Sequence, residues 1–348
     1  MRVAMVASLV SPLREAQLGG AQAFQTDLAR ALASRGHEVA LFCAAGSDLG
    51  GLRLETVPAP AGVERALVMP AGRPPPPLPG LRLAFAELFA RVRAWGGDVV
   101  SLHAFDAEAL EEAVGGELPV LHTLHLPPLV PAVMRAVLSA RGRPRVRFVT
   151  VSQAMRRAWS TAGLDEVQVI PNGVPVFEVP ELPVAARAMV AGRVSPEKGT
   201  ASAIRVARRV GLEPLVVGSV YDREYWRGQV CVPVRSVARP ELWRLMAASA
   251  VTLMPVEWDE PFGLVAAESQ MAGCPVVGYR RGGLPEVVTE GVGGFLVEPG
   301  DEEALAAAVE RARRLDRPSV RRAARERLDI GPVAVAYEEA LAALAGGR

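Results

Sequence analysis

Short apolar runs rich in β-branched residues alternate with helix-like segments along the first half of the chain. These runs are RVAMVASLV, EVALFC, DVVSLH, PVLHTLH, VRFVTVS and VQVIP. A helix is predicted after the first run, from about Gly20 to Arg35. Buried strands that alternate with crossover helices are typical of a parallel sheet. The pattern therefore predicts a parallel α/β domain.

The alternation stops in a proline-rich stretch, VPVFEVPELPVAA, and then resumes with ARAMVAGR, EPLVVGS, QVCVPV, AVTLMPV, CPVVGY and GGFLVE. A proline-rich stretch between periodic segments is typical of a linker. We therefore predict an N-terminal domain over residues 1–173, a linker over 174–186 and a C-terminal domain over 187–330. Both domains are expected to be Rossmann-like and doubly wound, with a cleft between them.

Composition narrows the possible partners. The chain has 348 residues, of which 50% are hydrophobic, so each half can bury a core. Its 38 acidic and 39 basic residues give a net charge of +1, which argues against a nucleic-acid partner held by a basic surface. We expect small or locally recognised ligands.

The sequence also bears on the compartment. Cys43, Cys231 and Cys274 are far apart and form no CxxC motif, which fits reduced, buried thiols. The apolar start, MRVAMVASLV, is followed by charged residues without a cleavage pattern, so a first strand is favoured over a signal peptide. No apolar run reaches the roughly 18 residues of a spanning helix. A cytoplasmic protein without a transmembrane segment is expected.

The stretch GRVSPEKG holds Lys198, the single lysine of the chain. It follows the first predicted strand of the C-terminal domain, and ligands of parallel sheets bind where strands end. The planar fork of Arg193 and the compact ammonium of Lys198 would together neutralise a diphosphate. A β-to-α turn with an exposed ion pair to Glu197 explains the same octapeptide equally well.

Two further stretches lie at predicted strand ends. Gly19 and Gly20 open the first helix, and a glycine pair lets backbone amides approach a phosphate. No GxGxxG follows the first strand and no GxxxxGK[ST] is present, which argues against a dehydrogenase or a P-loop protein. Asn172, the single asparagine, stands in VIPNGV, where we expect a tight turn rather than catalysis.

The segment EWDEPFGLVAAE places Glu260 before a helix and Glu268 in its second turn. The amides of Phe262, Gly263 and Leu264 would then point outward between two carboxylates. Carboxylates accept hydrogen bonds from sugar hydroxyls, and amides donate to phosphate oxygens. The arrangement suits a sugar attached to a phosphate, although glutamates near a helix start are also ordinary capping electrostatics.

Glu260 to Glu268 form a Glu-x7-Glu signature. Together with GRVSPEKG, VIPNGV, the glycine pair, DVVSLH, the T-x-H of HTLH and AGCPVVGYRRGGLPEVV, it resembles the retaining glycosyltransferases of family 4, which have the GT-B fold. The resemblance covers nearly the whole chain in the order of the family. It implies that the nucleotide sugar binds mainly to the C-terminal domain and the acceptor to the N-terminal one. Residues 331–348 would form a helix that crosses back to the N-terminal domain.

The resemblance also implies roles for individual residues. Arg193 and Lys198 would bind the donor diphosphate, which Gly19 and Gly20 approach from the first domain. Glu268 would bind the ribose, while Glu260 and the amides of residues 262–264 would hold the donor sugar. His125 would lie beside that sugar and the acceptor. His103 and His122 are candidates for the acceptor side or for packing at strand ends.

Negative charge grows on the leaving diphosphate during transfer, and fixed cations stabilise it there. With Arg193 and Lys198 in that role, we expect no cofactor and no metal, and the sequence has no convincing DxD pair. UDP is the expected nucleotide carrier. QVCVPV lacks the family's glycine before the base-binding loop, so GDP or another carrier is an alternative.

Two other functions fit parts of the same pattern. An epimerase or a phosphorylase-like enzyme on this fold would keep the nucleotide or phosphate site without releasing a glycosylated acceptor. A non-catalytic sugar-nucleotide-binding protein would bind the ligand and turn nothing over. A hexosyltransferase is the favoured function. The full set of Arg193, Lys198, Glu260 and Glu268 argues against the non-catalytic protein, and the epimerase or phosphorylase-like enzyme stays an alternative.

Overall fold

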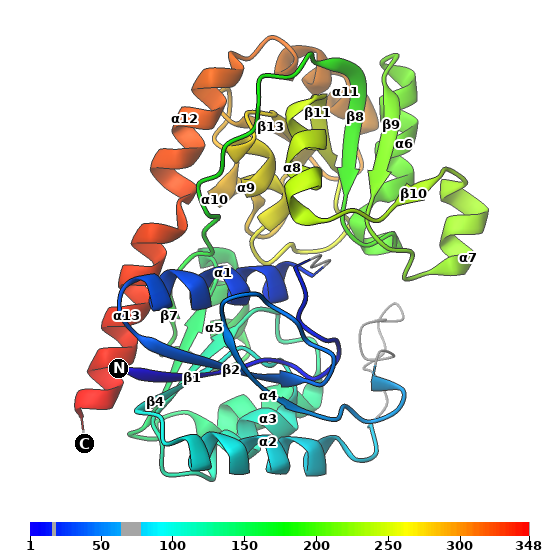
Figure 1. The fold of residues 1–348 in the computed structure, drawn as a ribbon. Coiled ribbons are helices and arrows are strands. Elements are labelled where there is room, and N and C mark those ends of the chain that lie inside the picture. The colour runs from blue at the N-terminus through cyan, green and yellow to red at the C-terminus, as the bar shows by residue number, and fades with distance from the viewer. Residues whose placement is uncertain (16–18, 64–77, 348) are drawn as a thin grey trace. The chain divides into compact units, whose positions relative to one another are not determined.

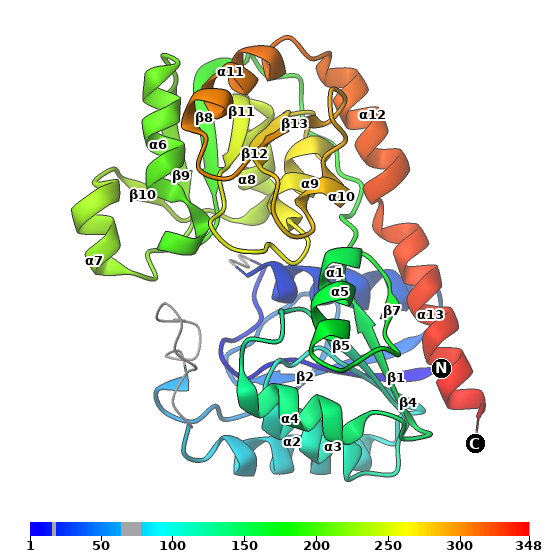
Figure 2. The ribbon, with the colours of Figure 1, turned by 180° about the vertical axis from the view of Figure 1, so that it is seen from behind.

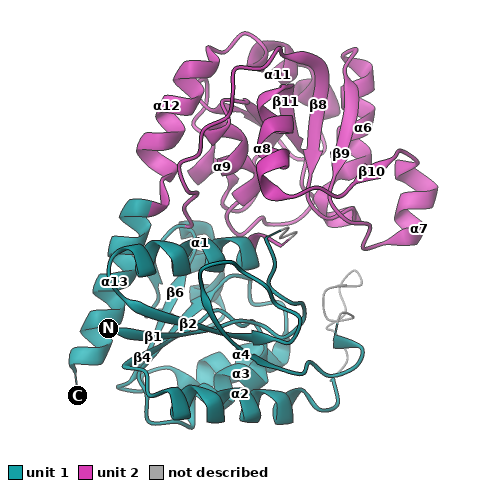
Figure 3. Ribbon diagram, in the orientation of Figure 1, with its two compact units in different colours: residues 1–15, 21–171, 331–348 teal, residues 16–20, 172–330 magenta. Residues whose placement is uncertain are grey.

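The computed structural model describes residues 1–15, 19–63 and 78–347. Contacts divide the chain into two compact units, which Figure 3 shows in different colours. Unit 1 comprises Met1–Glu15, Ala21–Pro171 and Gly331–Arg348, and unit 2 comprises Ala16–Gly20 and Asn172–Ile330. The last helix therefore belongs by its contacts to unit 1.

Unit 1 contains a parallel sheet of seven strands in the order β3-β2-β1-β4-β5-β6-β7. The strands are β1 (Arg2–Val6), β2 (Glu38–Ala44), β3 (Arg53–Val57), β4 (Val99–Leu102), β5 (Val120–Leu124), β6 (Val146–Thr150) and β7 (Gln168–Val169). The order reverses between β1 and β4. Ligands of doubly wound sheets bind outside the carboxyl ends of the strands at such a reversal.

Helices cover both faces of this sheet. They are α1 (Gly20–Ser34), α2 (Leu81–Trp95), α3 (Ala107–Val114), α4 (Pro131–Ala140), α5 (Gln153–Thr161) and α13 (Ile330–Gly346). Figures 1 and 2 show α2, α3 and α4 side by side on one face. On the other face α1 contacts α13, where the rings of Phe24 and Tyr337 are 5.9 Å apart. The sheet is therefore buried on both sides, which explains its continuous apolar runs.

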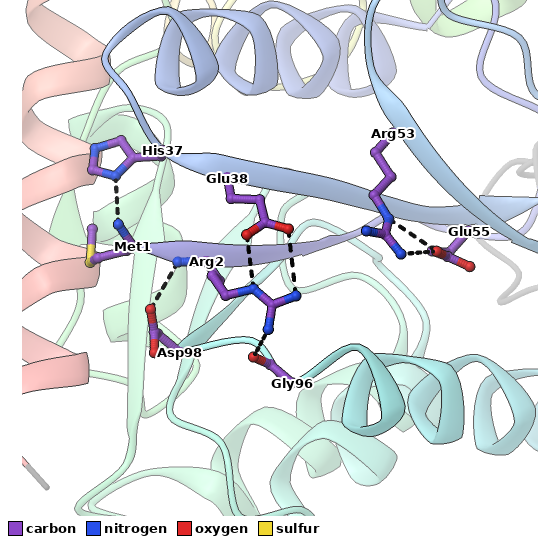
Figure 4. Close-up of polar contacts among 8 residues, drawn as sticks. All are labelled: Met1, Arg2, His37, Glu38, Arg53, Glu55, Gly96 and Asp98. Carbon is purple, nitrogen blue, oxygen red and sulfur yellow. Dashed lines mark hydrogen bonds and ion pairs between the residues drawn. The ribbon is translucent and has the colours of Figure 1, made fainter.

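The amino ends of the central strands of unit 1 are joined by polar contacts (Figure 4). The Arg2 amide donates to Asp98 Oδ2 at 2.8 Å. The Arg2 side chain donates to Glu38 Oε2 at 2.9 Å and to the Gly96 carbonyl at 2.8 Å. These contacts hold β1, β2 and the approach to β4 together. They lie at the amino ends of the strands. The candidate residues were predicted at the opposite, carboxyl ends.

Unit 2 repeats the arrangement with six parallel strands in the order β10-β9-β8-β11-β12-β13. The strands are β8 (Ala185–Ala191), β9 (Glu213–Val217), β10 (Val234–Arg235), β11 (Ser249–Met254), β12 (Val276–Tyr279) and β13 (Gly294–Val297). The order reverses between β8 and β11. The loops after these two strands carry GRVSPEKG and EWDEPFG.

The helical segments of unit 2 complete the two layers. They are the 3₁₀ turn η2 (Pro196–Lys198), α6 (Thr200–Arg209), α7 (Arg223–Tyr225), the π-helical η3 (Trp226–Val230), α8 (Arg239–Ala247), α9 (Leu264–Met271), α10 (Leu284–Val287), α11 (Glu302–Ala312) and α12 (Arg317–Leu328). Residues of α6 and α11 share one core cluster, and residues at the ends of α8 and α9 share another. The two clusters lie on opposite faces, as Figures 1 and 2 show.

The structure corrects the prediction for QVCVPV. Only Val234–Arg235 form a strand there, because η3 occupies Trp226–Val230 and Cys231 ends it with a φ of 49°. Cys231 is also exposed, whereas Cys43 and Cys274 are buried as expected. The first apolar residue of this stretch, Val230, belongs to the short helical turn and packs on the core.

The tight turn predicted at Asn172 is also wrong. Residues 171–173 form no turn, and Cys231 is the single non-glycine residue with positive φ in the described part of the chain. Gly173 is explained by close packing instead, since a Cβ there would lie 2.6 Å from the Cα of Ile330. Glycine is needed at this position for space and not for turn geometry.

Candidate functional site

Two predicted site residues of unit 2 meet at the reversal of its sheet. Lys198 follows β8 and Glu260 follows β11, and the Lys198 Nζ lies 2.6 Å from Glu260 Oε2. The indole Nε1 of Trp258 donates to the same oxygen at 2.8 Å. The ammonium also lies 4.8 Å from the centroid of the Trp258 ring, within the range of a cation–π contact. Residues 62 positions apart in sequence thus form one charged cluster.

The backbone brings the two loops into contact. Gly199 has a φ of 65°, and a Cβ there would lie 1.8 Å from the carbonyl oxygen of Pro255. The Glu257 amide donates to the Glu197 carbonyl at 2.9 Å. The loop after β12 supports the cluster as well, because the Gly283 amide donates to the Glu260 carbonyl at 2.7 Å. The position of Lys198 against Glu260 is therefore set by backbone packing.

Arg193 lies in the same loop as Lys198. Its Nη2 is 3.5 Å from Glu197 Oε1, and the two side chains are 25% and 29% exposed. This is the partly exposed ion pair that the simpler interpretation of the turn expected. The Ser195 hydroxyl donates to the same carboxylate at 2.7 Å. A guanidinium and an ammonium, each beside a carboxylate, therefore stand in one loop at the carboxyl end of β8.

Glu268 lies in the second turn of α9, as predicted, and is held by two residues that the sequence did not single out. Its Oε1 accepts from Arg239 Nε at 2.5 Å and from Trp243 Nε1 at 3.3 Å. The Trp243 ring stacks on Phe177 with 3.8 Å between centroids and 3° between planes. The side chain of Glu268 is only 5% exposed. Its orientation is thus fixed by α8 and by the segment before β8.

The helix α9 begins where the sequence predicted. Gly263 precedes its first residue with a φ of 98°, and no side chain caps it. The first amides of a helix have no intrahelical acceptor, so Leu264 and its neighbours offer donors there. The side chains of Phe262 and Leu264 are buried, which leaves the backbone as the polar element of this turn.

The predicted histidines of unit 1 also gather at strand ends. His103 follows β4 and His125 follows β5, and His103 Nδ1 lies 2.9 Å from His125 Nε2. The other nitrogen of His103, Nε2, lies 2.9 Å from the hydroxyl of Ser101. His122 is separate, with its Nε2 3.0 Å from the Ala104 carbonyl. The pair His103 and His125 therefore continues a polar row that starts within β4.

Burial keeps these imidazoles uncharged. Desolvation lowers the pKa of His125 to about 3 and that of His122 to about 4. It lowers the pKa of His103 well below its ordinary value, and the neighbouring histidines lower it further. At neutral pH each ring has one donor and one acceptor nitrogen.

Several polar residues of unit 1 that the sequence analysis did not single out lie near the predicted ones. The Ser8 hydroxyl donates to Asp106 Oδ2 at 2.7 Å and links the loops after β1 and β4. Burial raises the pKa of Asp106 to about 6. The Tyr337 hydroxyl of α13 lies 3.1 Å from Thr123 Oγ1, and its ring stacks on His103. The one signal for Asp106 in the sequence was its position four residues after the end of β4.

The remaining predicted residues are placed as follows. Gly20 begins α1, as expected, and Gly19 directly precedes it. Among the described residues, no group of three or more His, Cys, Asp or Glu side chains is arranged to hold a metal ion. Within the same residues, none of the helices has the length and apolarity needed to cross a bilayer.

Two doubly wound units, with charged loops at the reversal of the second sheet, define an α/β protein with a candidate ligand site. Comparisons with known proteins specify the family. The family "Glycosyltransferase Family 4" matches residues 18–176, and "Glycosyl transferases group 1" matches residues 185–327. The chain belongs to these glycosyltransferases. The predicted glycosyltransferase class is confirmed.

Curated relatives agree with this assignment, and a solved structure agrees with the fold. The chain is 28% identical to a D-inositol 3-phosphate glycosyltransferase of Xylanimonas cellulosilytica, over 88% of this chain and 86% of that one. It is 30% identical to a glycogen synthase of Mycobacterium tuberculosis, over 72% and 68%. The structure of Anabaena HepE in complex with UDP and glucose matches with a TM-score of 0.75 at 21% identity, over 98% and 99%. The predicted fold class, with two Rossmann-like GT-B domains, is confirmed.

Proposed function

We propose that this protein is a retaining hexosyltransferase that moves a sugar from a UDP-sugar to an acceptor hydroxyl. The anomeric carbon loses its bond to the diphosphate oxygen and gains one to the acceptor oxygen, whose proton is released. The observation that carries the proposal is the pairing of Lys198 with Glu260 at 2.6 Å, at the sheet reversal of unit 2. The crystallised complex of HepE with UDP and glucose supports the choice of nucleotide.

In this proposal the cations stabilise the leaving group. Lys198 and Arg193 stand beside carboxylates, so their charges are balanced before a donor binds. A diphosphate that enters the loop adds a second anionic partner for the ammonium. Its charge increases as the anomeric bond breaks, so the interaction is stronger in the transition state than in the ground state.

The glutamates divide the rest of the donor between them. Glu260 is held by Lys198 and Trp258, and it would accept hydrogen bonds from hydroxyls of the transferred sugar. Glu268 uses Oε1 for Arg239 and Trp243, and we assign its carboxylate to the ribose hydroxyls. The amides of Phe262, Gly263 and Leu264 at the start of α9 would donate to donor oxygens.

Three histidines of unit 1 and the glycine pair at the start of α1, a pair that belongs to unit 2 by its contacts, complete the proposed reaction. His125 would act beside the transferred sugar and the acceptor, with His103 behind it and His122 toward the acceptor side. Gly19 and Gly20 would present amides at the start of α1 to the diphosphate. The acceptor is defined only as a molecule with a free hydroxyl.

A panel of nucleotide sugars tests the donor. A ligand that binds only the native state raises its melting temperature, by roughly 2.7 kcal/mol of stabilisation at a hundredfold excess over Kd. We expect UDP and one UDP-sugar to stabilise the protein, and GDP-sugars to have no effect. Stabilisation by a GDP-sugar alone would overturn the choice of UDP. Release of an isomerised sugar without any acceptor would identify an epimerase.

Metal removal tests the role of the two cations. Because Arg193 and Lys198 already supply positive charge for the diphosphate, saturating EDTA should leave the initial rate nearly unchanged. The rate is measured as UDP release with the donor found in the panel. Loss of most of the activity with EDTA, and its return with Mg²⁺ or Mn²⁺, would contradict the proposed site.

The polar row in unit 1 sets the protonation of His125 in this proposal. Ser101 is fully buried, and in the described contacts its hydroxyl faces only His103 Nε2. If Ser101 donates, His103 carries its proton on Nδ1 and donates to His125 Nε2. The proton of His125 then lies on Nδ1. The opposite direction would leave a buried hydroxyl without an acceptor, at a cost of roughly 1–3 kcal/mol.

Long-range ¹H–¹⁵N spectra of the histidine rings check this assignment. We expect the Nδ1–H tautomer at His125 in the native protein and a mixture of tautomers in Ser101→Ala. Ser139→Ala is the control, because that hydroxyl bonds to the Ala136 carbonyl within α4. An Nε2–H tautomer at His125 in the native protein would show that the row runs in the opposite direction.

A further inference from the structure

A pocket lies in unit 2, at the end of the sheet opposite the loops that carry the candidate donor site. Its volume is about 710 Å³. The wall is made by the segment before β8, by the last turns of α8 and α9, and by α12. The donor-site loops follow the carboxyl ends of β8 and β11, whereas this pocket lies where β8 begins.

Four arginines of α12 line the pocket: Arg317, Arg321, Arg322 and Arg325. Part of their hydrogen-bonding capacity is structural. Arg317 donates to the Ser249 and Ala247 carbonyls at 2.9 and 2.6 Å, and Arg321 donates to the Ala272 carbonyl at 2.9 Å. Arginines at helix C-termini satisfy carbonyls that have no intrahelical donor.

The structural contacts leave positive charge and donors unused. The Nε atoms of Arg321 and Arg325 are buried without a hydrogen-bond partner among the described residues. The pKa of Arg321 is lowered, first by burial and then by the charges of Arg325 and Arg317. Arg325 Nη2 pairs with Glu178 Oε1 at 2.5 Å, and Glu181 and Glu326 line the same pocket, so four positive charges meet three negative ones. Buried donors without acceptors destabilise the protein unless a ligand satisfies them.

Apolar side chains also line the pocket. Leu182 and Val184 are 36% and 49% exposed, although both are large hydrophobic residues. Both belong to the segment that precedes β8 and line the pocket with Pro180. The lining of the pocket therefore combines guanidinium groups with hydrocarbon.

We propose that this pocket binds a ligand with a phosphate or diphosphate group, separately from the donor site. The planar guanidinium of arginine pairs with two oxygens of a phosphate at once, which suits a cluster on one helix face. The hydrocarbon part of the ligand would lie against Leu182 and Val184. A free phosphate ester and the headgroup of an anionic lipid share this chemistry. The proposal goes beyond the proposed transferase activity and does not depend on it.

Calorimetry with inorganic pyrophosphate tests the pocket. Arg322→Gln is the first variant, because Arg322 is exposed and its one described bond is to Ser319 Oγ, so the fold should tolerate the change. Arg321→Gln is the second. Each should weaken pyrophosphate binding roughly tenfold or more, since a charged hydrogen bond contributes about 1.5–3 kcal/mol. Arg314→Gln removes the same charge outside the pocket and should leave binding unchanged.

Two further measurements identify the binding site and the source of the phosphate group. Lys198→Ala should leave pyrophosphate binding to the pocket intact. A loss with Lys198→Ala but not with Arg322→Gln would place pyrophosphate in the donor site and overturn the proposal, as would equal losses with Arg314→Gln. Co-sedimentation with phosphatidylcholine vesicles, with and without phosphatidylglycerol, separates a lipid headgroup from a free ester. Binding to neither vesicles nor pyrophosphate rejects the pocket.

Discussion

Replacing Lys198 with alanine is expected to lower kcat by roughly 10²- to 10³-fold, the usual effect of removing a preorganised charge stabiliser. The ammonium is the group nearest Glu260, and in the proposed reaction it faces the diphosphate as the anomeric bond breaks. Steady-state kinetics with saturating donor and acceptor measure the effect. KM for the donor should change much less than kcat, because the charge acts mainly in the transition state.

Lys198→Arg separates charge from shape. It keeps the positive charge but replaces a compact ammonium by a larger planar group beside Trp258 and Arg193. We expect only part of the lost rate to return. Equal kcat and donor affinity in Lys198→Arg and the native protein would show that any cation suffices there, and that the single lysine has no special role.

Stability has to be measured in the same variants. Lys198→Ala leaves the Glu260 carboxylate with Trp258 as its described donor, at a side-chain exposure of 11%. An unpaired, largely buried charge destabilises the native state. Lys198→Ala/Glu260→Gln removes that charge, so it should recover stability without recovering kcat. A recovered kcat would assign the loss to misfolding rather than to chemistry.

Glu268 and Glu260 are expected to affect different parts of the donor. Glu268→Ala should weaken UDP itself by roughly 10- to 100-fold, the usual effect of a lost charged hydrogen bond. Glu260→Ala should leave UDP affinity near the native value and weaken the intact UDP-sugar. Calorimetry with both ligands makes the distinction.

The partners of Glu268 require a matched control. Arg239, with a side chain only 10% exposed, loses its carboxylate in Glu268→Ala, so a lower melting temperature is expected. Glu268→Gln keeps an oxygen for Arg239 and Trp243 and should be more stable. A similar loss of UDP affinity for Glu260→Ala and Glu268→Ala would reject the division of roles.

The two-domain α/β class could be predicted because it depends on the regular alternation of apolar runs with helical segments and on the proline-rich stretch that interrupts it. Parallel strands buried on both faces appear as continuous apolar runs, and a proline-rich stretch separates the two sets. The strand β3 (Arg53–Val57) was not predicted, because it lies at the edge of its sheet and only Val57 is buried. QVCVPV failed for the opposite reason, since apolar residues of a short helical turn resemble a buried strand.

The candidate residues were identified because the ends of strands can be predicted from a parallel α/β sequence. Arg193, Lys198, Glu260 and Glu268 all follow apolar runs, where ligands of such sheets bind. The side chains that contact them could not be predicted. Nothing in the local sequence pattern connects Trp258 with Lys198, or Arg239 and Trp243 with Glu268. Side-chain contacts between separate segments leave no repeating pattern along the sequence.

The sequence by itself therefore determined most of the elements, the candidate residues at the ends of two strands, and the glycosyltransferase class. Only the tertiary structure decided which of those groups meet. The contact between Lys198 and Glu260 exists because β8 and β11 are neighbours in a sheet whose order skips β9 and β10. Strand order is fixed by the packing of helices on both faces, which depends on the whole domain and not on any one segment.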